Sequence, residues 1–277
     1  MDQVTSGDGL LSPSSIFGET WIMANKQGEF IWYELMTPDV AGARAFYQAV
    51  AGWTIADKSE MPGMDYRMVN APDGSVGGVM PIDADMAAHG ARPIWVGYVG
   101  VEDVDASVAA IKAMGGAIHM GPVDIPDVGR LAMASDPQGG LFYVMRGAVE
   151  DGTSTAFAPG KLGHCGWNEL STPDQDGAHA FYGKLFGWTN PETMPMGPMG
   201  DYRFLYLDDL RLGASMHRDG QAFWQSYFHV ASINAAADAV KAQGGTVDQG
   251  PMEVPGGDHI IVGTDPQGAR FALVGPL

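Results

Sequence analysis

The sequence of 277 residues contains a single cysteine, Cys165, and few basic side chains, with 15 lysines and arginines against 33 acidic residues. One cysteine excludes an intrachain disulfide framework and a zinc site built from several cysteines. The net charge of −18 argues against nucleic acid and anionic membrane surfaces as partners. The sequence contains no apolar run of about 18 residues, so it predicts no membrane-spanning helix. Residues 1–27 lack the basic start and apolar core of a signal peptide, so we expect a soluble cytoplasmic protein.

The most informative feature that is present is an internal repeat. The segment FIWYELMTPD at residues 30–39 returns as CGWNELSTPD at 165–174, and the turn DPQG at 136–139 returns at 265–268. The offset between matching positions is 135 residues at the first pair and 129 at the second. A nearly constant offset predicts a duplicated domain, and its decrease predicts a length change in the loop at 82–93.

The repeat divides the chain into four parts. We expect an N-terminal extension over residues 1–27, a first domain over 28–147, a linker over 148–162 and a second domain over 163–277. The linker is rich in glycine, serine, threonine and proline, which is typical of a connection between domains.

Within each copy, the order strand, helix and three strands occurs twice. Alternation predicts a strand over 30–36, followed by a helix with Thr37 as its N-cap and Gly52 at its end. The second unit has a strand over 94–101 and a helix over 103–114 that begins at Asp103. The sequence therefore predicts an α+β chain of four such units in two domains.

The Thr-Pro-Asp, Ala-Phe-Tyr and Gly-Trp series at residues 37–53 and 172–188, with the two Asp-Pro-Gln-Gly turns, resembles the vicinal oxygen chelate superfamily of glyoxalases, bleomycin-resistance proteins and extradiol dioxygenases. The resemblance covers roughly residues 28–146 and 163–275 and is nearest to tandem glyoxalase-like proteins of bacteria. It implies that the two βαβββ units of each domain form one curved mixed sheet around a cavity. It also implies a divalent metal bound by His, Gln or Glu on the first strand of each unit and Glu on the last.

At the metal positions, however, this sequence departs from the family. The resemblance places those positions at Trp32, Val96 and Tyr143 in the first domain and at Trp167, Gln225 and Ala272 in the second. Only the glutamine among these side chains can ligate, and one ligand does not hold a divalent metal. We expect no metal and no other cofactor, with a divalent metal at an unusual site as the alternative.

Strand alternation predicts which side chains face each cavity, because residues two apart share a face. The expected ligand-binding residues are Trp32, Met36, Tyr98, Trp167, Ser171, Gln225 and Tyr227. Glu34 and Glu169 share those faces, where a buried carboxylate needs a partner, a raised pKa or water. They are the predicted catalytic or ligand-binding carboxylates. The structural alternative is a salt bridge or backbone hydrogen bond, for instance with Arg67 or Arg203.

The remaining candidates have a structural alternative as well. His229 is the one histidine expected on a strand and facing inward, where it either joins Glu169 in acid–base or metal chemistry or has a structural role. We expect five further histidines in loops or on the surface, namely His89, His119, His179, His217 and His259. Trp95 and Trp224 are expected either to stack on a flat ligand or to pack in the core. The methionine-rich stretches at 61–64 and 194–199 are predicted as apolar lids or docking loops.

The function that these observations favour is binding of a small, largely apolar or aromatic molecule in one or both cavities, without the usual metal centre. The alternative is a lyase, isomerase or dioxygenase-like enzyme at Glu34, Glu169 or His229. A weaker possibility is that the pockets are closed and the surface serves protein interaction. The expected partner is a small-molecule ligand, with neither nucleic acid nor membrane, and the chain is expected as a monomer with pseudo-dimeric domains or as a homodimer.

Overall fold

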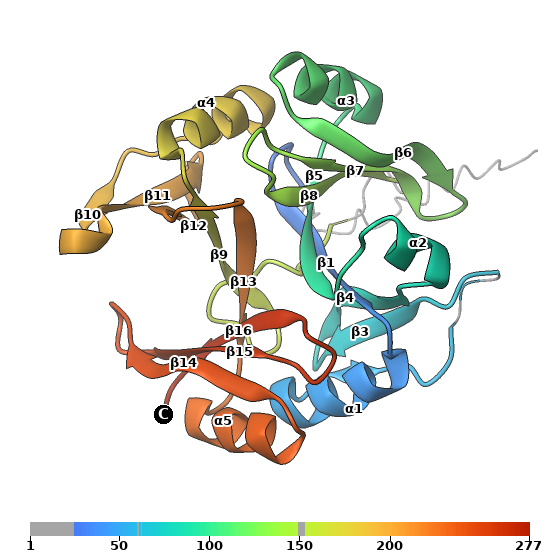
Figure 1. Ribbon diagram of the computed structural model, residues 1–277, viewed down its shortest axis with the longest axis vertical. Helices are drawn as coiled ribbons and strands as arrows, with labels where there is room; N and C mark the ends of the chain where they lie inside the picture. Colours follow the sequence, from blue (N-terminus) through green and yellow to red (C-terminus); the bar gives the residue numbers. More distant parts are fainter. Residues whose placement is uncertain (1–24, 60, 62, 149–152) are drawn as a thin grey trace, which may run out of the picture.

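Each half of the chain folds into one curved eight-stranded sheet built from two βαβββ units (Figure 1). The computed structural model describes residues 25–59, 61, 63–148 and 153–277. Residues 1–24, which make up most of the predicted N-terminal extension, lie outside the described residues. The duplication and the α+β fold class predicted from the repeat are confirmed.

In the first sheet the strands are ordered β2-β3-β4-β1-β5-β8-β7-β6. The central strands β1 and β5 are antiparallel, whereas β1 pairs with β4 and β5 pairs with β8 in parallel. The strands are β1 (Phe30–Thr37), β2 (Thr54–Ile55), β3 (Arg67–Ala71), β4 (Gly74–Pro81), β5 (Ile94–Gly100), β6 (Ala117–Ile125), β7 (Gly129–Ser135) and β8 (Leu141–Gly147). The helices are α1 (Val40–Ala51), α2 (Ala84–Ala88) and α3 (Val104–Ala113).

The second sheet repeats this arrangement in the order β10-β11-β12-β9-β13-β16-β15-β14. Its strands are β9 (Cys165–Thr172), β10 (Thr193–Pro195), β11 (Asp201–Leu207), β12 (Leu210–His217), β13 (Phe223–His229), β14 (Thr246–Glu253), β15 (His259–Thr264) and β16 (Arg270–Gly275). Its helices are α4 (Gln175–Phe186), α5 (Ile233–Ala242) and the short 3-10 helix η1 (Gly197–Met199). None of the described helices is long and apolar enough to cross a membrane.

The first helix begins two residues later than predicted. Thr37 is the last residue of β1, and the N-cap is Asp39, whose Oδ1 accepts from the Gly42 N–H at 2.9 Å. The Thr37 hydroxyl instead accepts from the Asp39 N–H at 3.3 Å, which forms a turn just before the helix. The helix ends as predicted at Gly52, which has a left-handed φ of 70°.

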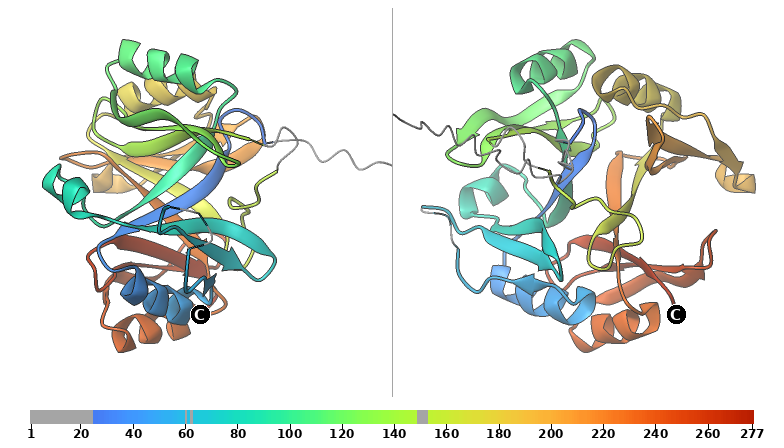
Figure 2. Two further views of the ribbon diagram at one scale, coloured as in Figure 1. Left: turned by 90° about the vertical axis from the view of Figure 1, so that its right-hand side faces the viewer. Right: turned by 180° about the vertical axis from the view of Figure 1, so that it is seen from behind.

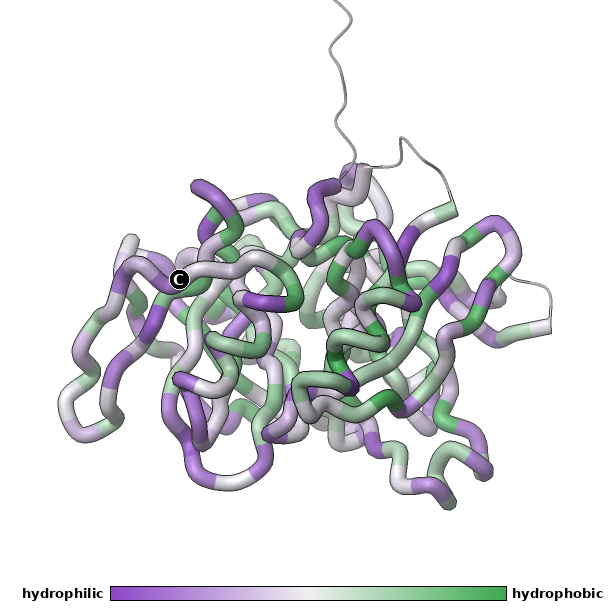
Figure 3. Tube along the Cα trace, turned by 90° about the horizontal axis from the view of Figure 1, so that it is seen from above, coloured by the Kyte–Doolittle hydropathy of each residue, from purple (hydrophilic) through white to green (hydrophobic). Residues whose placement is uncertain are grey.

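The helices pack in pairs that join the two domains. In Figures 1 and 2, α1 lies beside α5 at one end of the molecule and α3 lies beside α4 at the other. Buried side chains from both halves form one common core, whose largest members include Tyr33, Phe46, Tyr47, Tyr182 and Phe228. In Figure 3, hydrophobic stretches run through both halves, while several outer loops are hydrophilic. The two sheets therefore share their largest core, and each has a smaller cluster of its own on the opposite face.

Two matching hydrogen-bond chains cross this shared core. The Tyr47 hydroxyl donates to Asp265 Oδ2 at 3.0 Å and accepts from Trp95 Nε1 at 2.9 Å. In the other direction, Tyr182 donates to Asp136 Oδ2 at 2.8 Å and accepts from Trp224 at 3.0 Å. The aspartates are those of the two Asp-Pro-Gln-Gly turns, so each turn is held by the opposite domain. Trp95 is buried in the shared core and the partly buried Trp224 packs against it, which favours the core interpretation of both over stacking on a ligand.

We predict that the variants Tyr47→Phe and Tyr182→Phe each lose about 1–3 kcal/mol of unfolding free energy. Each change leaves a buried aspartate oxygen and a buried indole N–H without a partner, and the repeat symmetry makes the two losses similar. Urea unfolding followed by circular dichroism measures the loss. Tyr206→Phe is the matched control, because the Tyr206 hydroxyl lies in an exposed contact with Glu192. A loss no larger than that of the control would contradict a stabilising role of these bonds.

Candidate functional site

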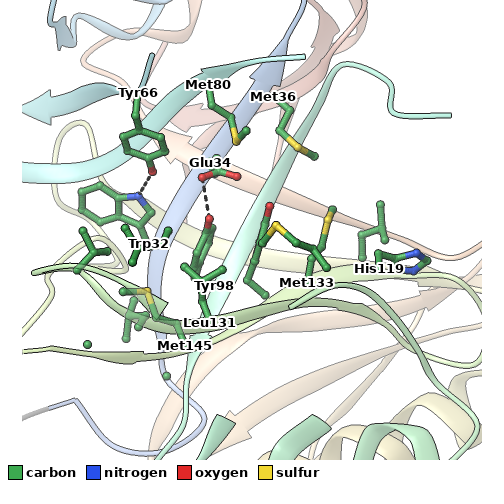
Figure 4. A pocket seen from close by; sticks show the side chains of 18 of the residues that line it. Trp32, Glu34, Met36, Tyr66, Met80, Tyr98, His119, Leu131, Met133 and Met145 are labelled. Carbon is green, nitrogen blue, oxygen red and sulfur yellow. Dashed lines mark hydrogen bonds between the residues drawn. The ribbon is translucent and has the colours of Figure 1, made fainter. Parts of the chain in front are cut away.

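The concave side of the first sheet encloses an open cavity of about 2090 Å³. Methionine thioethers dominate its wall, and more than half of the chain's 17 methionines lie there: Met36, Met61, Met64, Met68, Met80, Met86, Met120, Met133 and Met145. The aromatic side chains of Trp32, Tyr66, Tyr98 and Tyr143 complete the inner wall. Figure 4 shows the thioethers and rings arranged around one carboxyl group, that of Glu34.

Glu34 lies in the middle of β1, where alternation directs it to the cavity face as predicted. Only 2% of the residue is exposed, and its Oε2 accepts from the Tyr98 hydroxyl at 2.7 Å. Burial raises the pKa of Glu34, because the ionised form loses its hydration, while the Tyr98 hydroxyl that donates to it and the nearby hydroxyls of Tyr143 and Tyr66 oppose this rise. The site therefore holds a carboxyl group whose proton affinity exceeds that of an ordinary glutamate.

Further contacts position the tyrosines around this group. Trp32 Nε1 donates to the Tyr66 hydroxyl at 2.7 Å, and the ring of Tyr143 stacks on that of Tyr98 with a centroid distance of 4.1 Å. Gly78 on β4 lets Tyr66 lie close to the strand, since a Cβ at that position would collide with the tyrosine ring. These contacts fix three hydroxyl groups around one carboxyl group.

The other oxygen of this carboxyl group, Glu34 Oε1, is buried and has no hydrogen-bond partner. Although the Tyr66 and Tyr143 hydroxyls face the carboxyl group closely enough to lower its pKa, neither forms a hydrogen bond with Oε1. A buried acceptor without a partner is unfavourable by about 1–3 kcal/mol, and such groups are uncommon in folded proteins. Glu34 is part of the cavity wall, but this oxygen itself is buried.

The second domain repeats the carboxylate but surrounds it differently. Glu169 Oε2 accepts from the Tyr202 hydroxyl at 2.6 Å and Oε1 from the Tyr227 hydroxyl at 3.4 Å. Burial raises the pKa of Glu169, and the nearby Arg270 guanidinium is one of the groups that lower it. The arginine stands where the first repeat has Leu141. Both oxygens of Glu169 are therefore occupied by the protein itself.

Arg67 and Arg203, which the structural alternative named as partners of Glu34 and Glu169, do not pair with these glutamates. Arg67 pairs with Asp65 at 2.7 Å and Arg203 pairs with Asp176, and neither contacts the carboxylates of the cavity faces. The partners are tyrosine hydroxyls instead. Adjacent side chains of an extended chain point to opposite faces, so Tyr66 and Tyr202 point toward the glutamates while the arginine after each points away.

The predicted ligand-binding residues divide between the two sheets. Trp32, Met36 and Tyr98 line the first cavity. Trp167, Ser171, Gln225 and Tyr227 share one face of β9 and β13 in the second sheet, with Gln225 paired to Glu169 across the strands. Gln225 Oε1 accepts from Arg270 Nε at 2.9 Å, which ties this glutamine into the second carboxylate cluster.

The structure gives His229 the contacts of its structural alternative. His229 Nε2 accepts from the Gly160 N–H at 2.8 Å, and its ring lies over Gly166; among the described residues no hydrogen bond joins it to Glu169. Burial lowers the pKa of His229. His119 is exposed, as predicted, but it lies on the strand β6 and also lines the first cavity, where its Nε2 bonds Ser135 at 3.0 Å.

Tyr66 and Tyr143 were not predicted as site residues. Tyr66 had a sequence signal, since Asp-Tyr-Arg occurs at 65–67 and again at 201–203. The sequence signal for Tyr143 was weaker. It occupies one of the family's metal positions, and it was considered there only as a side chain that cannot bind the metal.

The residues present do not fit the divalent metal that the family implies. Indole, valine and phenol side chains occupy the metal positions in the first domain, and glutamine is the only donor at those of the second. In the described part of the chain, no three His, Cys, Asp or Glu side chains come together as a metal-ion site. The expected absence of a metal stays a prediction.

The length change between the repeats lies at the mouth of the first cavity. The connection from β4 to β5 is longer than its counterpart between β12 and β13, and it holds the short helix α2 where a loop was predicted. Met86, Asp83 and His89 from this connection line the cavity, yet α2 has no buried residues. The first domain thus carries a cavity-covering element that the second repeat does not have.

Comparison with known proteins places these features in a family. The profile of the Glyoxalase/Bleomycin resistance protein/Dioxygenase superfamily matches residues 29–144 and 161–273. The putative glyoxylase CFP32 of Mycobacterium tuberculosis is 32% identical over 256 residues, covering 91% of this chain and 96% of the relative. The anthracycline biosynthesis protein DnrV of Streptomyces peucetius is 28% identical over 260 residues, covering 88% of this chain and 91% of the relative.

Solved structures support the same fold. A variant of homoprotocatechuate 2,3-dioxygenase from B. fuscum has a TM-score of 0.63 at 15% identity, and the match covers 92% of this chain and 72% of that one. The Mn(II)-bound glyoxalase from Novosphingobium aromaticivorans has a TM-score of 0.60 at 17% identity, with 90% and 82% covered. At this identity the likeness concerns the fold alone.

We predict that Glu34→Gln raises the unfolding temperature at pH 8 and that the gain shrinks as the pH falls toward 4. Between its ordinary and its raised pKa, the folded protein binds a proton that the unfolded chain has released, so stability falls as pH rises through this window. The neutral amide removes this penalty. In a chain of this size, a gain of about 1 kcal/mol in unfolding free energy raises the unfolding temperature by about 2–4 °C. Scanning calorimetry across the pH range measures it.

Glu192→Gln is the control, since Glu192 forms an exposed pair with Arg211. A Glu34→Gln gain of equal size at pH 4 and pH 8, or a loss at pH 8, would contradict the buried-charge account.

Proposed function

Because the chain belongs to the Glyoxalase/Bleomycin resistance protein/Dioxygenase superfamily, we propose that it uses the cavity of its first domain to bind a small, largely apolar aromatic molecule without a metal held by the protein. The observation that carries this proposal is the combination of a thioether- and ring-lined cavity with one buried, unpartnered carboxyl oxygen. Ligand sites are mostly apolar with a few polar groups that fix orientation, and this cavity has that composition.

The wall chemistry supports a planar ligand. The stacked rings of Tyr98 and Tyr143 are inclined by only 12° and give a flat surface, and thioethers make favourable contacts with aromatic rings. The cavity of about 2090 Å³ is larger than the roughly 300–1,000 Å³ of common ligand sites, which leaves room for several fused rings. The name of the Streptomyces relative DnrV refers to anthracyclines, whose cores consist of fused rings. This supports the proposal for the present chain by analogy.

A second candidate function is an enzyme in which Glu34 acts as a general base. The observation that favours it is the raised pKa of a carboxyl group in the cavity wall, since a base with a pKa nearer to neutrality is better suited to proton transfer. Conversion of a bound ligand, abolished in Glu34→Gln while binding persists, distinguishes this function from binding alone.

We also propose that the protein works as a cytoplasmic monomer. The common core and the paired helices support this, because they give one chain the contacts that two single-domain copies would otherwise make between them.

We predict that naphthalene-sized aromatic compounds bind the purified protein and that Trp32→Ala weakens this binding by about three- to tenfold, the effect of one aromatic contact. Trp167→Ala, the matched change in the second domain, leaves the affinity unchanged. Isothermal titration calorimetry measures both, with and without prior treatment with a chelator. Loss of binding on chelation, or an equal effect of the two tryptophan changes, would contradict the proposal.

We predict that replacing residues 82–93 with the corresponding five residues of the second repeat, 218–222, speeds dissociation of the same probe. The exchange removes α2 and with it Met86 from the cavity mouth. Since α2 has no buried residues, the unfolding temperature should change little. Stopped-flow fluorescence gives the dissociation rate, and a rate unchanged from the wild type would contradict a covering role for this helix.

A further inference from the structure

We propose that the second domain holds a separate site for the carboxylate group of a small apolar ligand, formed by Arg218 and Arg270 beside the ring of Phe223. The site goes beyond the binding function proposed for the first cavity and does not depend on it. Arg218 follows the end of β12, whereas Phe223 and Arg270 are the first residues of β13 and β16. The strand directions bring all three residues to the same end of the second sheet.

Both guanidinium groups pack on one aromatic ring. The Cζ atoms of Arg218 and Arg270 each lie 5.1 Å from the centroid of the Phe223 ring, so they are at most twice that distance apart. An aromatic ring attracts a cation to its face. The Arg270 group is held further by its Nε, which donates to Oε1 of the buried Gln225 at 2.9 Å. Two positive charges are thereby held close together.

These two charges have no acidic partner in the part of the chain that the structure describes. Neither arginine forms a salt bridge there, and Arg270 uses only one of its five N–H donors. The charge of Arg270 acts on Glu169, but the oxygens of that carboxylate accept from Tyr202 and Tyr227 instead. Acidic residues outnumber basic ones by 33 to 15 in this chain, so two adjacent arginines without a carboxylate partner are unexpected. An anion from solution supplies the missing acceptor.

The first repeat shows that this arrangement replaces an apolar one. The residues that correspond to Arg218, Phe223 and Arg270 are Ile82, Ile94 and Leu141. The backbone confirms the first of these pairs, because each N–H donates to the carbonyl of a matching threonine, Thr37 or Thr172, at 2.8 and 3.0 Å. In the first domain, the second and third of these side chains line the cavity. Three matching apolar side chains are therefore exchanged together for two cations and an aromatic ring.

The short connection between β12 and β13 leaves both arginines accessible. In the first domain the corresponding connection is longer and holds the helix α2, whereas residues 218–222 contain no helix. Arg218 is exposed, and Phe223 and Arg270 are partly exposed. A ligand from solution can therefore reach both guanidinium groups.

The donors and the neighbouring surface select the class of ligand. Planar guanidinium donors match the two oxygens of a carboxylate. Alternation along β16 places Arg270 on the same face as Ala272. Ala272 belongs to a small apolar cluster with Tyr227, Val262 and Val274, against which the partly buried Trp167 and Ile260 pack. A single carboxylate on an apolar body therefore fits the arginines and the cluster together, whereas the acidic protein disfavours ligands of higher negative charge.

The test compares 2-naphthoate with 2-naphthamide, which has the same rings and a similar shape but no charge. Isothermal titration calorimetry on the full wild-type chain should show a preference for the naphthoate of at least about tenfold, as for hydrogen bonds to a charged group. The first cavity cannot produce this preference, because its own carboxyl group, Glu34, disfavours a second carboxylate.

The variants Arg218→Ile and Arg270→Leu introduce the residues of the first repeat. Each should lower the naphthoate preference below about threefold. Arg211→Leu is the matched control, because it removes the same charge from the same sheet, at an exposed arginine that pairs with Glu192. Its preference should equal that of the wild type. Arg218→Ile changes an exposed side chain in a connection, so the test does not depend on the folding of Arg270→Leu.

Three results would overturn the carboxylate site: equal binding of both probes to the wild type, a preference that persists in both Arg218→Ile and Arg270→Leu, or an equal loss in Arg211→Leu. Competition by inorganic phosphate at the affinity of the naphthoate would overturn the apolar carboxylate in favour of oxyanions in general. Binding of uncharged naphthalene should be the same in wild type and all three variants. Its absence would overturn the function proposed for the first cavity and leave the carboxylate site intact.

Discussion

Burial of the Glu34 carboxyl group among tyrosine hydroxyls and thioethers is the interaction on which the character of the first domain depends. An ionised carboxylate in an apolar cavity needs hydrogen bonds in place of water, and the hydroxyls of three tyrosines face it. Their positions in turn require the hydrogen bond from Trp32 to Tyr66, the close approach at Gly78 and the stacking of two tyrosine rings. One oxygen of the carboxyl group is buried without a hydrogen-bond partner, and the thioethers and rings around it form the wall on which the proposed aromatic ligand packs.

Duplication makes this unpaired oxygen interpretable. Both domains keep the same chain of contacts from a tryptophan to a tyrosine, beside a glutamate on the first strand of each sheet. They differ on β8 and β16, where Leu141 and Tyr143 correspond to Arg270 and Ala272. In the second domain, Arg270 and two tyrosine hydroxyls satisfy the carboxylate without a ligand. The first domain has the additional helix α2 beside its cavity. The first copy is therefore the one that we propose as the binding site for the aromatic ligand, while both copies contribute to the shared core and the helix contacts.

Much of the fold could be predicted from the sequence because periodicity and repetition are local signals. The family resemblance carried by the Thr-Pro-Asp and Asp-Pro-Gln-Gly landmarks is confirmed, as are the alternation of β1 and the Asp103 cap. The site was predictable only in part, since alternation tells which face Glu34 occupies but not which residues from distant strands meet it there. Tyr66, Tyr143 and His119 reach the cavity through sheet curvature and strand pairing, which no local pattern encodes. The hydrogen bonds that cross between the domains were missed for the same reason.

The central claim is that the cavity of the first domain binds a small, apolar aromatic molecule, and a crystal structure of the protein with naphthalene tests it most directly. The account predicts the ring between the methionine and tyrosine walls of the first domain. A ring bound only at the second sheet, or a first cavity that stays empty at saturating naphthalene, would contradict it.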